Sequence, residues 1–214
     1  MRLHHLDNAR VTDTDRAVVS HRRANLIVAA VGLGLVTLCG LAAADGKVSA
    51  PERSVFRAIN DLPAWLYRLL WIFQQFGNVV VAVIIGVLVA LWRRRPRVAA
   101  VVVVAIFLKL GLERVVKEII QRDRPGLTVG LIHARGAVSQ HGLSFVSGHS
   151  VIVTALAVVL APVIPVKWKA LPWIIVVLNG FTRIYVGAHN PLDVVGGAGL
   201  GLFIGGILNA AVPL

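Results

Sequence analysis

The sequence is poor in charged residues, and this scarcity excludes an ordinary soluble domain. Only 15% of the 214 residues are charged, whereas 57% are hydrophobic and the mean hydropathy is +0.79. So few polar groups cannot cover the surface of a water-soluble protein of this length. A lipid bilayer is therefore the expected solvent, and the length fits one compact domain.

Acidic residues are especially rare, with 10 Asp and Glu against 22 Lys and Arg and a net charge of +12. Such an excess can indicate nucleic-acid binding. Here most cations lie in short polar gaps between apolar runs, where membrane topology accounts for them. We therefore expect membrane lipids as partners and no nucleic acid.

Cysteine is nearly absent. The single Cys39 lies inside an apolar run and cannot form an internal disulfide, so it gives no information on the redox compartment. We expect it to be a small packing residue in a membrane span.

Long apolar runs predict an all-α, polytopic membrane protein with six transmembrane helices. The predicted spans are residues 24–44, 69–92, 98–112, 150–166, 171–186 and 191–212. The third helix should continue to Ile120, and the polar residues 121–147 should form a loop. We assign residues 1–23 to a cytoplasmic tail, partly helical at best, and residues 24–214 to one membrane domain. The sequence leaves open whether residues 1–44 are cleaved.

Residues 45–68 mix polar and apolar positions at helical spacing, which predicts one amphipathic helix at the membrane surface. Asp45 and Ser49 are candidate turn or cap residues, and Pro51 suits a first helical turn. The predicted apolar face consists of Val55, Phe56, Ile59, Leu62, Leu66 and Leu69.

The distribution of cations predicts the orientation in the membrane. The tail, residues 93–97 and residues 167–169 carry five, four and two cations and fall on one side of the six-span map. The positive-inside rule makes this side cytoplasmic. We therefore expect a protein of the cell membrane with both termini in the cytoplasm.

Three segments on the opposite, extracytoplasmic side carry the residues suited to chemistry. In the first, Lys117 is followed after six residues by Arg124-Pro125. The second is Val146-Ser147-Gly148-His149, and in the third Thr182-Arg183 is followed by His189 and then by Asp193. Cations at a membrane are costly and indicate function, and three that converge suit a phosphate group.

The remaining residues complete a site for phosphoryl transfer. Ser147 is a candidate N-cap of the following helix, whose N–H groups bind anions, and Gly148 permits close approach of a ligand. Asp193 lies four residues after His189 and can orient its ring, which would leave one nitrogen as a nucleophile. His149 is then the acid–base group.

No metal or cofactor is expected, because the nearby carboxylates are spread over two segments and do not resemble a magnesium site. They are Glu113, Glu118, Asp123 and Asp193.

Together the three segments resemble the signature of the type 2 phosphatidic acid phosphatase superfamily, in its six-span membrane branch. The resemblance covers the chain from about Leu69 to its end. It implies that His189 is the nucleophile, His149 the general acid and Asp193 the partner of His189. It also implies that phosphate is bound by Lys117, Arg124, Ser147, Gly148 and Arg183.

Two positions depart from the family pattern. Val146 replaces a proline, which removes a fixed φ before the helix, and Thr182 replaces a serine but keeps the hydroxyl. Their effect on turnover is open. Among neighbouring residues, Arg122 is either a secondary anion contact or without a role. His133, Arg135 and His141 either contact a head group or belong to a solvated loop.

The expected function is metal-independent hydrolysis of a lipid phosphate or diphosphate through a phosphohistidine intermediate. Polyprenyl diphosphate, phosphatidate and related lipids all fit, and the sequence does not choose among them. A lipid phosphotransferase using the same site is one alternative, and a phospholipid transporter or flippase without hydrolysis is another. The oligomeric state is unknown.

Overall fold

The computed structural model describes the backbone of residues 3–212 and 214, and it describes the side chains of residues 16, 18–212 and 214. This part of the chain is all-α. Its elements are α1 (Leu3–Ala43), α2 (Ala50–Asn60), α3 (Leu66–Gln75), α4 (Val79–Arg93), α5 (Pro96–Ile119), α6 (Pro125–Thr128), α7 (Gly148–Leu160), the 3-10 turn η1 (Val166–Trp168), α8 (Ala170–Tyr185) and α9 (Pro191–Ala211).

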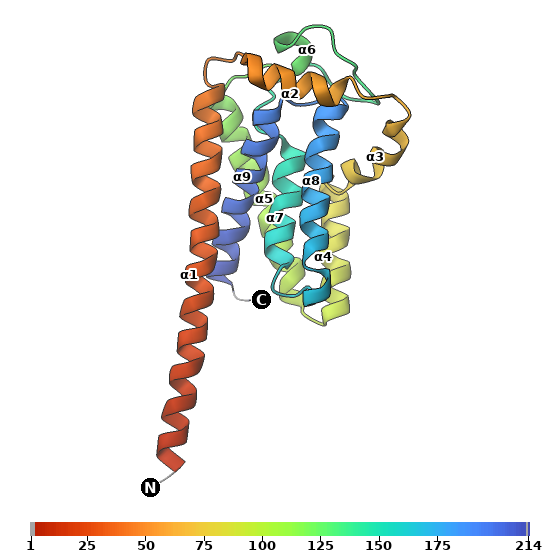
Figure 1. The fold of residues 1–214 in the computed structure, drawn as a ribbon. Coiled ribbons are helices and arrows are strands. Elements are labelled where there is room, and N and C mark those ends of the chain that lie inside the picture. Colours follow the sequence, from red (N-terminus) through yellow and green to blue (C-terminus); the bar gives the residue numbers. More distant parts are fainter. Residues whose placement is uncertain (1–2, 213) are drawn as a thin grey trace.

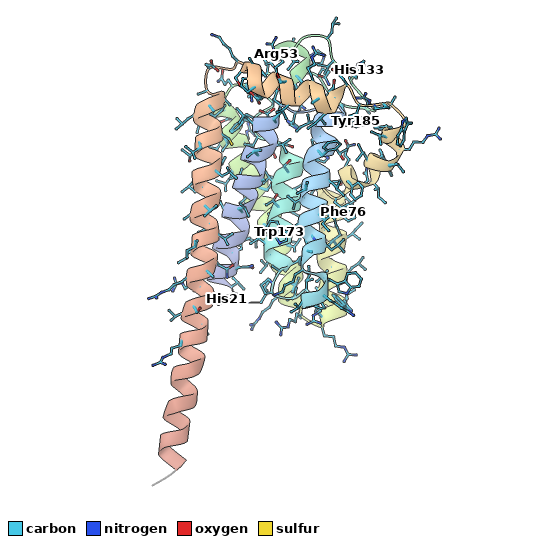
Figure 2. The ribbon with its side chains drawn as sticks, viewed as in Figure 1. His21, Arg53, Phe76, His133, Trp173 and Tyr185 are labelled. Atoms are coloured by element: carbon cyan, nitrogen blue, oxygen red, sulfur yellow. The ribbon has the colours of Figure 1, made fainter. Side chains whose placement is uncertain are left out.

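Helices α1, α4, α5, α7, α8 and α9 run side by side in a bundle, and α2 and α6 lie at one of its ends (Figure 1). Arg53 and His133 are at this end, whereas His21 is far along α1 in the other direction (Figure 2). Helix α7 is central and contacts α4, α5, α8 and α9. Its residues are almost all buried, which explains why it is apolar around its whole circumference.

Small residues allow α1 and α7 to pack closely against α9. A Cβ atom added to Gly201 would lie 2.6 Å from the Val151 carbonyl of α7, and one added to Gly199 would lie 2.9 Å from the Gly32 carbonyl of α1. The glycines of α9 therefore serve close helix packing. Cys39 is buried and unpaired, as expected of a packing residue.

Two helical segments are long and apolar enough to cross a membrane, Val18–Ala43 and Pro191–Ala211, within the described residues. The pair α3 and α4 counts as a third if its two parts form one span, since they meet at a bend of 62°. The sequence predicted one span over residues 69–92, and the structure divides this segment into the two helices α3 and α4. The Asn78 side chain accepts a hydrogen bond from the Val80 amide (2.8 Å) and so starts a new helix there.

Two other helices differ from their predicted lengths. The predicted span 150–166 ends at Leu160, because a turn and the short η1 follow. The tail was expected to be partly helical at best, but α1 is continuous from Leu3 into the first span. The predicted helices at residues 98–120, 171–186 and 191–212 agree with α5, α8 and α9 to within two residues.

The predicted amphipathic helix over residues 45–68 is present only as α2, and α3 begins at Leu66 after a turn. Ser49 caps α2 by accepting a hydrogen bond from the Glu52 amide, and Pro51 lies in the first turn, as predicted. Phe56 is buried, but Val55 is exposed. The predicted face is shifted because α2 packs against α8 and α9 through Glu52, Phe56 and Asn60.

Candidate active site

A cavity of about 420 Å³ lies where the end of α5, the start of α7, the end of α8 and the turn before α9 meet. Six residues singled out from the sequence line it: Lys117, Arg124, Gly148, His149, Arg183 and His189. Ser147 and Asp193 are buried directly behind this lining. The fold therefore brings all three sequence segments to one place at the end of the bundle that carries α2.

The two arginines of the cavity are held by neutral oxygen atoms. Arg124 donates from Nε to the His141 carbonyl and from Nη1 to the Ala188 carbonyl, both at 3.0 Å. Arg183 donates from Nη1 to Oε1 of Gln74 at 2.7 Å. These acceptors orient the guanidinium groups without neutralising them. Burial lowers the pKa of Arg124, so its charge is poorly solvated and suited to an anionic ligand.

Lys117 differs from the arginines because it already has an anionic partner. Its Nζ atom is 2.9 Å from Oε1 of Glu113, whose Oε2 atom is 2.6 Å from Nζ of Lys109. The carboxylate lies directly over Gly148, where an added Cβ would be 2.7 Å from either oxygen. An anionic group thus occupies the space at the start of α7 that the glycine leaves open.

His189 is oriented through a serine that the sequence analysis missed. The Ser144 Oγ atom donates to Oδ2 of Asp193 at 2.5 Å and is 3.3 Å from Nδ1 of His189. The direct distance from Nδ1 to Oδ2 of Asp193 is 3.8 Å, which is too long for the hydrogen bond that we expected. Oδ2 also accepts from the Asn190 amide at 2.7 Å, and this holds the carboxylate at the start of α9.

The protonation of His189 follows from its burial. Desolvation lowers the pKa of this histidine to about 4, although Asp193 opposes the shift. The ring is therefore neutral at pH 7 and available as a nucleophile.

Ser147 begins α7, but its side chain does not form the predicted cap. Its amide donates to the Asp193 carbonyl (2.9 Å), while its Oγ atom is buried without a hydrogen-bond partner. Val146, which stands in place of the family proline, is fully buried beside it. The Thr182 hydroxyl donates to the Leu178 carbonyl of its own helix at 2.6 Å.

Arg122 has a structural role and is not the anion contact considered from the sequence. Its side chain is completely buried, and Nη1 donates to Glu52 at 3.0 Å and to Asp193 at 3.1 Å. Nη2 donates to Glu52 and to the Lys47 carbonyl. Burial opposes the charge, but the two carboxylates raise the pKa of Arg122. Because Glu52 also accepts from the Leu192 amide, this network joins α2 to the start of α9.

Arg135 likewise serves the loop and not a ligand. It donates to the carbonyls of Asn60, Leu62 and Tyr185, and its guanidinium lies 4.2 Å from the centre of the Tyr185 ring. His133 is exposed, and its amide donates to Asn60. These contacts fasten the 121–147 loop to α2 and α8.

The bend between α3 and α4 also contributes to the cavity. A Cβ atom on Gly77 would lie 2.7 Å from Cδ2 of His149, so the bend packs directly on this ring. Gln74 precedes the bend and holds Arg183, and Asn78 lines the cavity. A continuous span over residues 69–92 would not place these groups here.

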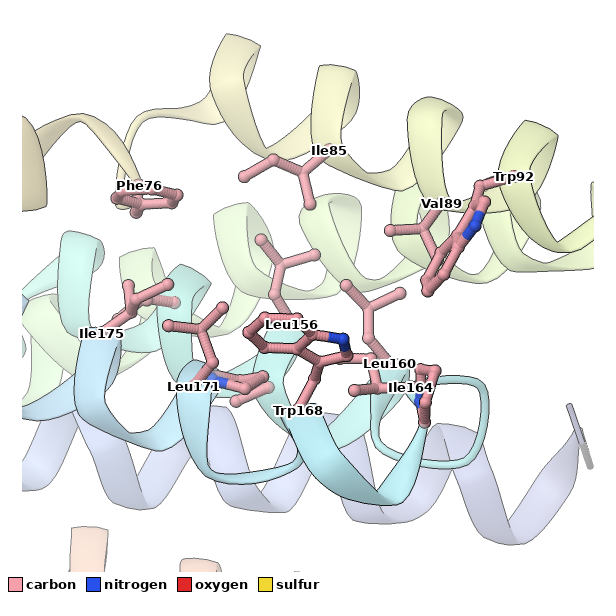
Figure 3. Close-up of a pocket in the computed structure, with 14 residues that line it drawn as sticks. Phe76, Ile85, Val89, Trp92, Leu156, Leu160, Ile164, Trp168, Leu171 and Ile175 are labelled. Carbon is pink, nitrogen blue, oxygen red and sulfur yellow. The ribbon is translucent and has the colours of Figure 1, made fainter.

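A second cavity, also about 420 Å³, is almost wholly apolar and lies among α4, α7 and α8. Phe76 lies at one end of it, next to the bend, and Trp92 and Ile164 lie at the other end (Figure 3). Its lining of Val, Leu, Ile and Trp side chains suits a hydrocarbon chain. No cluster of three or more side chains that could ligate a metal occurs among the described residues.

Comparison with known proteins agrees with this arrangement. Residues 98–213 match the model of the PAP2 superfamily. An undecaprenyl-diphosphatase of Sulfolobus acidocaldarius is 30% identical over 152 residues, which is 70% of this chain and 73% of the relative.

Two crystal structures have a similar fold. That of Aquifex aeolicus LpxE has a TM-score of 0.64 at 28% identity, covering 72% of this chain and 92% of that one. That of a transmembrane PAP2-type phosphatidylglycerolphosphate phosphatase of Bacillus subtilis has a TM-score of 0.66 at 24% identity, covering 84% and 94%. The chain therefore belongs to the PAP2 superfamily, and it is a membrane phosphatase of that family acting on lipid phosphates.

Proposed function

We propose that this protein hydrolyses a lipid phosphate or diphosphate through a phosphohistidine on His189, without a metal ion. The observation that carries the proposal is the cavity in which Lys117, Arg124 and Arg183 lie with His149 and His189. Cations at fixed positions stabilise the charge of a transferring phosphoryl group, and a neutral imidazole attacks it.

The reaction has two balanced steps. In the first, Nε2 of His189 forms a bond to phosphorus, the bond from phosphorus to the leaving oxygen breaks, and His149 gives that oxygen a proton. In the second, His149 takes a proton from water, whose oxygen attacks phosphorus and breaks its bond to His189. Ser144 and Asp193 keep Nδ1 engaged, so that Nε2 is the attacking atom. The Gly148 amide contributes to phosphate binding at the start of α7.

The apolar cavity supports a lipid as the substrate. It begins at Phe76, beside the bend that packs on His149, and follows α4. A chain buried there gains about 0.8 kcal/mol for each CH₂ group, which a water-soluble phosphate ester does not. The candidate substrates are polyprenyl diphosphate, phosphatidate and related lipids. The similarity to an undecaprenyl-diphosphatase favours a polyprenyl diphosphate among them.

We further propose six spans in the cell membrane, with both termini cytoplasmic and the cavity at the extracytoplasmic face. The spans are α1, the bent pair α3 and α4, α5, α7, α8 and α9. The support is the cluster of cations at residues 93–97 and 167–169, which lies opposite the end that carries the cavity. Reporter fusions after Lys47, Arg95, Gly130 and Lys169 should alternate outside, inside, outside, inside. A cytoplasmic report at Gly130 would contradict this topology.

The central test uses purified protein in mixed micelles with a panel of lipid phosphates and diphosphates. We expect phosphate release that persists with a chelator, is inhibited by vanadate and passes through an acid-labile, base-stable phosphoenzyme. Added alcohol should leave inorganic phosphate as the product. A phosphorylated alcohol would instead indicate the phosphotransferase. Loss of activity with the chelator would contradict the mechanism.

A further inference from the structure

Two charged residues of the cavity lining, Lys109 and Glu113, lie outside the three sequence segments and have no part in the proposed mechanism. Lys109 is buried in α5, two helical turns before Lys117, and lines the same cavity. Among the described residues, Glu113 is the one carboxylate within ion-pair distance of it. Lysine in an apolar helix is costly, which makes such a residue a candidate for function.

The ion-pair geometry shows an anion shared between two cations. Lys109, Glu113 and Lys117 are four residues apart along one face of α5. One carboxylate oxygen of Glu113 contacts Lys109, and the other contacts Lys117. Two lysines against one glutamate leave a surplus positive charge. A group of ion pairs that served stability alone would contain equal numbers of positive and negative charges, since uncompensated buried charge is destabilising.

The position of the shared carboxylate is where a ligand anion would bind. It lies over Gly148 at the start of α7, and helix N-termini of this kind bind phosphate. Gly148 directly precedes His149, the group assigned to the leaving oxygen, and both line the cavity. In a diphosphate ester, the phosphoryl group next to the lipid is this leaving group.

We propose that the Glu113 carboxylate is an internal stand-in for the second phosphoryl group of a diphosphate substrate. The terminal phosphoryl group lies against Lys117, Arg124, Arg183 and His189. The second phosphoryl group displaces Glu113 and contacts Lys109, with Lys117 between the two groups. A monophosphate ester has no such group and leaves Glu113 in place. This inference rests on the proposed phosphatase site and names its substrate class, and it makes Lys109 a residue that determines specificity.

The displaced carboxylate has a place to go. A further cavity, of about 560 Å³, lies on the outer side of α5. It is lined by the cations Lys109, Arg114, Lys117 and Arg124, by Glu113, and by Glu118, whose charge is paired with Arg114. Glu113 can turn into it and keep cationic neighbours. The exchange therefore moves one anion by a rotation of its side chain and does not require a helix to move.

The test compares a prenyl diphosphate with the monophosphate of the same chain length in mixed micelles. Lys109→Gln should lower kcat/KM for the diphosphate about tenfold, and for the monophosphate much less, because one charge-assisted contact is lost. Lys109→Arg should keep the preference. Lys167→Gln, the same change in η1 at the other end of the bundle, should alter neither value.

Binding provides a second measurement that does not depend on turnover. Methylenediphosphonate, which is not hydrolysed, should raise the Tm of the wild-type protein more than methylphosphonate does. Glu113→Gln removes the internal competitor, so its Kd for methylenediphosphonate should fall about tenfold.

The outcomes separate this inference from the phosphatase proposal. If neither ester is hydrolysed by the wild type, the phosphatase proposal fails. Binding of the two phosphonates still tests whether Lys109 and Glu113 form a site for a second phosphoryl group. Equal losses with both esters in Lys109→Gln would overturn the inference. Equal stabilisation of the wild type by the two phosphonates would overturn it too, even if Lys109→Gln does not fold.

Discussion

Arg122 and Arg124 are two residues apart in one loop, and their surroundings are opposite. Arg122 is sealed between two carboxylates, whereas Arg124 is held by two backbone carbonyls and faces the cavity. The carboxylates satisfy the charge of Arg122 and fasten α2 to α9. The carbonyls orient Arg124 but leave its charge for a ligand. We call the network of Arg122, Glu52 and Asp193 the structural half of the site and the lining of the cavity the binding half. The arginine of the structural half is neutralised by carboxylates, whereas Arg124 and Arg183 in the binding half are held by neutral oxygen atoms.

The largest effect should come from His189, the proposed nucleophile, which lines the cavity and contacts Ser144. His189→Asn keeps a side chain of similar polarity but removes the attacking nitrogen, so kcat should fall at least about 10⁴-fold. Phosphate release and phosphoenzyme trapping both measure this loss. His21→Asn, on α1 far from the cavity, is the control. Full activity in His189→Asn would exclude a phosphohistidine at this position.

On the binding half, Arg124→Gln should impair activity and spare stability. Removing one cation that stabilises transition-state charge costs about 10²–10³-fold in kcat/KM. Thermal unfolding in detergent should change little or shift upward, because the cavity loses an uncompensated charge. A large drop in Tm would show that Arg124 belongs to the structural half.

On the structural half, Arg122→Gln should have its main effect on stability. It leaves Glu52 and Asp193 buried without their cation, which typically costs about 3–5 kcal/mol. The measurement is the Tm in detergent, with Arg114→Gln as the matched control because its ion pair with Glu118 is exposed. Equal Tm values for the two variants would contradict the division between the halves.

Ser144 lies between Asp193 of the structural half and His189 of the binding half. Removing its hydroxyl should lower activity less than the changes above. Ser144→Ala deletes the hydroxyl between Asp193 and His189, so the ring is less well oriented while the ion pairs of Asp193 remain. We expect kcat to fall about tenfold with KM nearly unchanged, as for a lost hydrogen bond to a charged group. Ser54→Ala, on the exposed side of α2, is the control. A change in KM alone would contradict a positioning role.

The smallest effect concerns pH. The pKa of His189 is lowered to about 4, against about 6.5 for a free histidine. The neutral nucleophile therefore persists as pH falls from 7 to 5.5 and is lost only near pH 4. NMR of ¹³C-histidine-labelled protein, with His189→Asn to assign the signal, measures this directly. A midpoint above 6 would show that the ring is better solvated than its burial indicates.

The sequence predicted the binding half better than the structural half. Lys117, Arg124, His149, Arg183 and His189 lie at helix ends or in short turns, so their spacing along the chain constrains where their side chains can meet. The order of the three segments therefore predicted the cavity lining. Glu52 and Ser144 belong to no such pattern, and their partners lie 70 and 45 residues away in the chain. Only the fold reveals those pairs.

The break at residues 76–78 could not be predicted from hydropathy, because a window as long as a span averages the polar residues near the break with the apolar residues on both sides. The Gly77-Asn78 pair was the available signal, since Asn is a common N-cap. Hydropathy averages over such a pair, whereas its hydrogen bond decides where α4 begins. The break is important for the site, because Gln74 contacts Arg183 and Gly77 contacts His149.

The close packing of α1 against α9 sets an order of events during biosynthesis. Gly32 and Gly199 bring the first and the last helix together, and roughly 150 residues separate the end of α1 from the start of α9. At ordinary rates of translation this interval takes about 10–30 s. Until α9 is inserted, Gly32 of α1 lacks the helix that it contacts in the folded protein, so the bundle remains open on this side for most of the synthesis. The last helix to be made closes it.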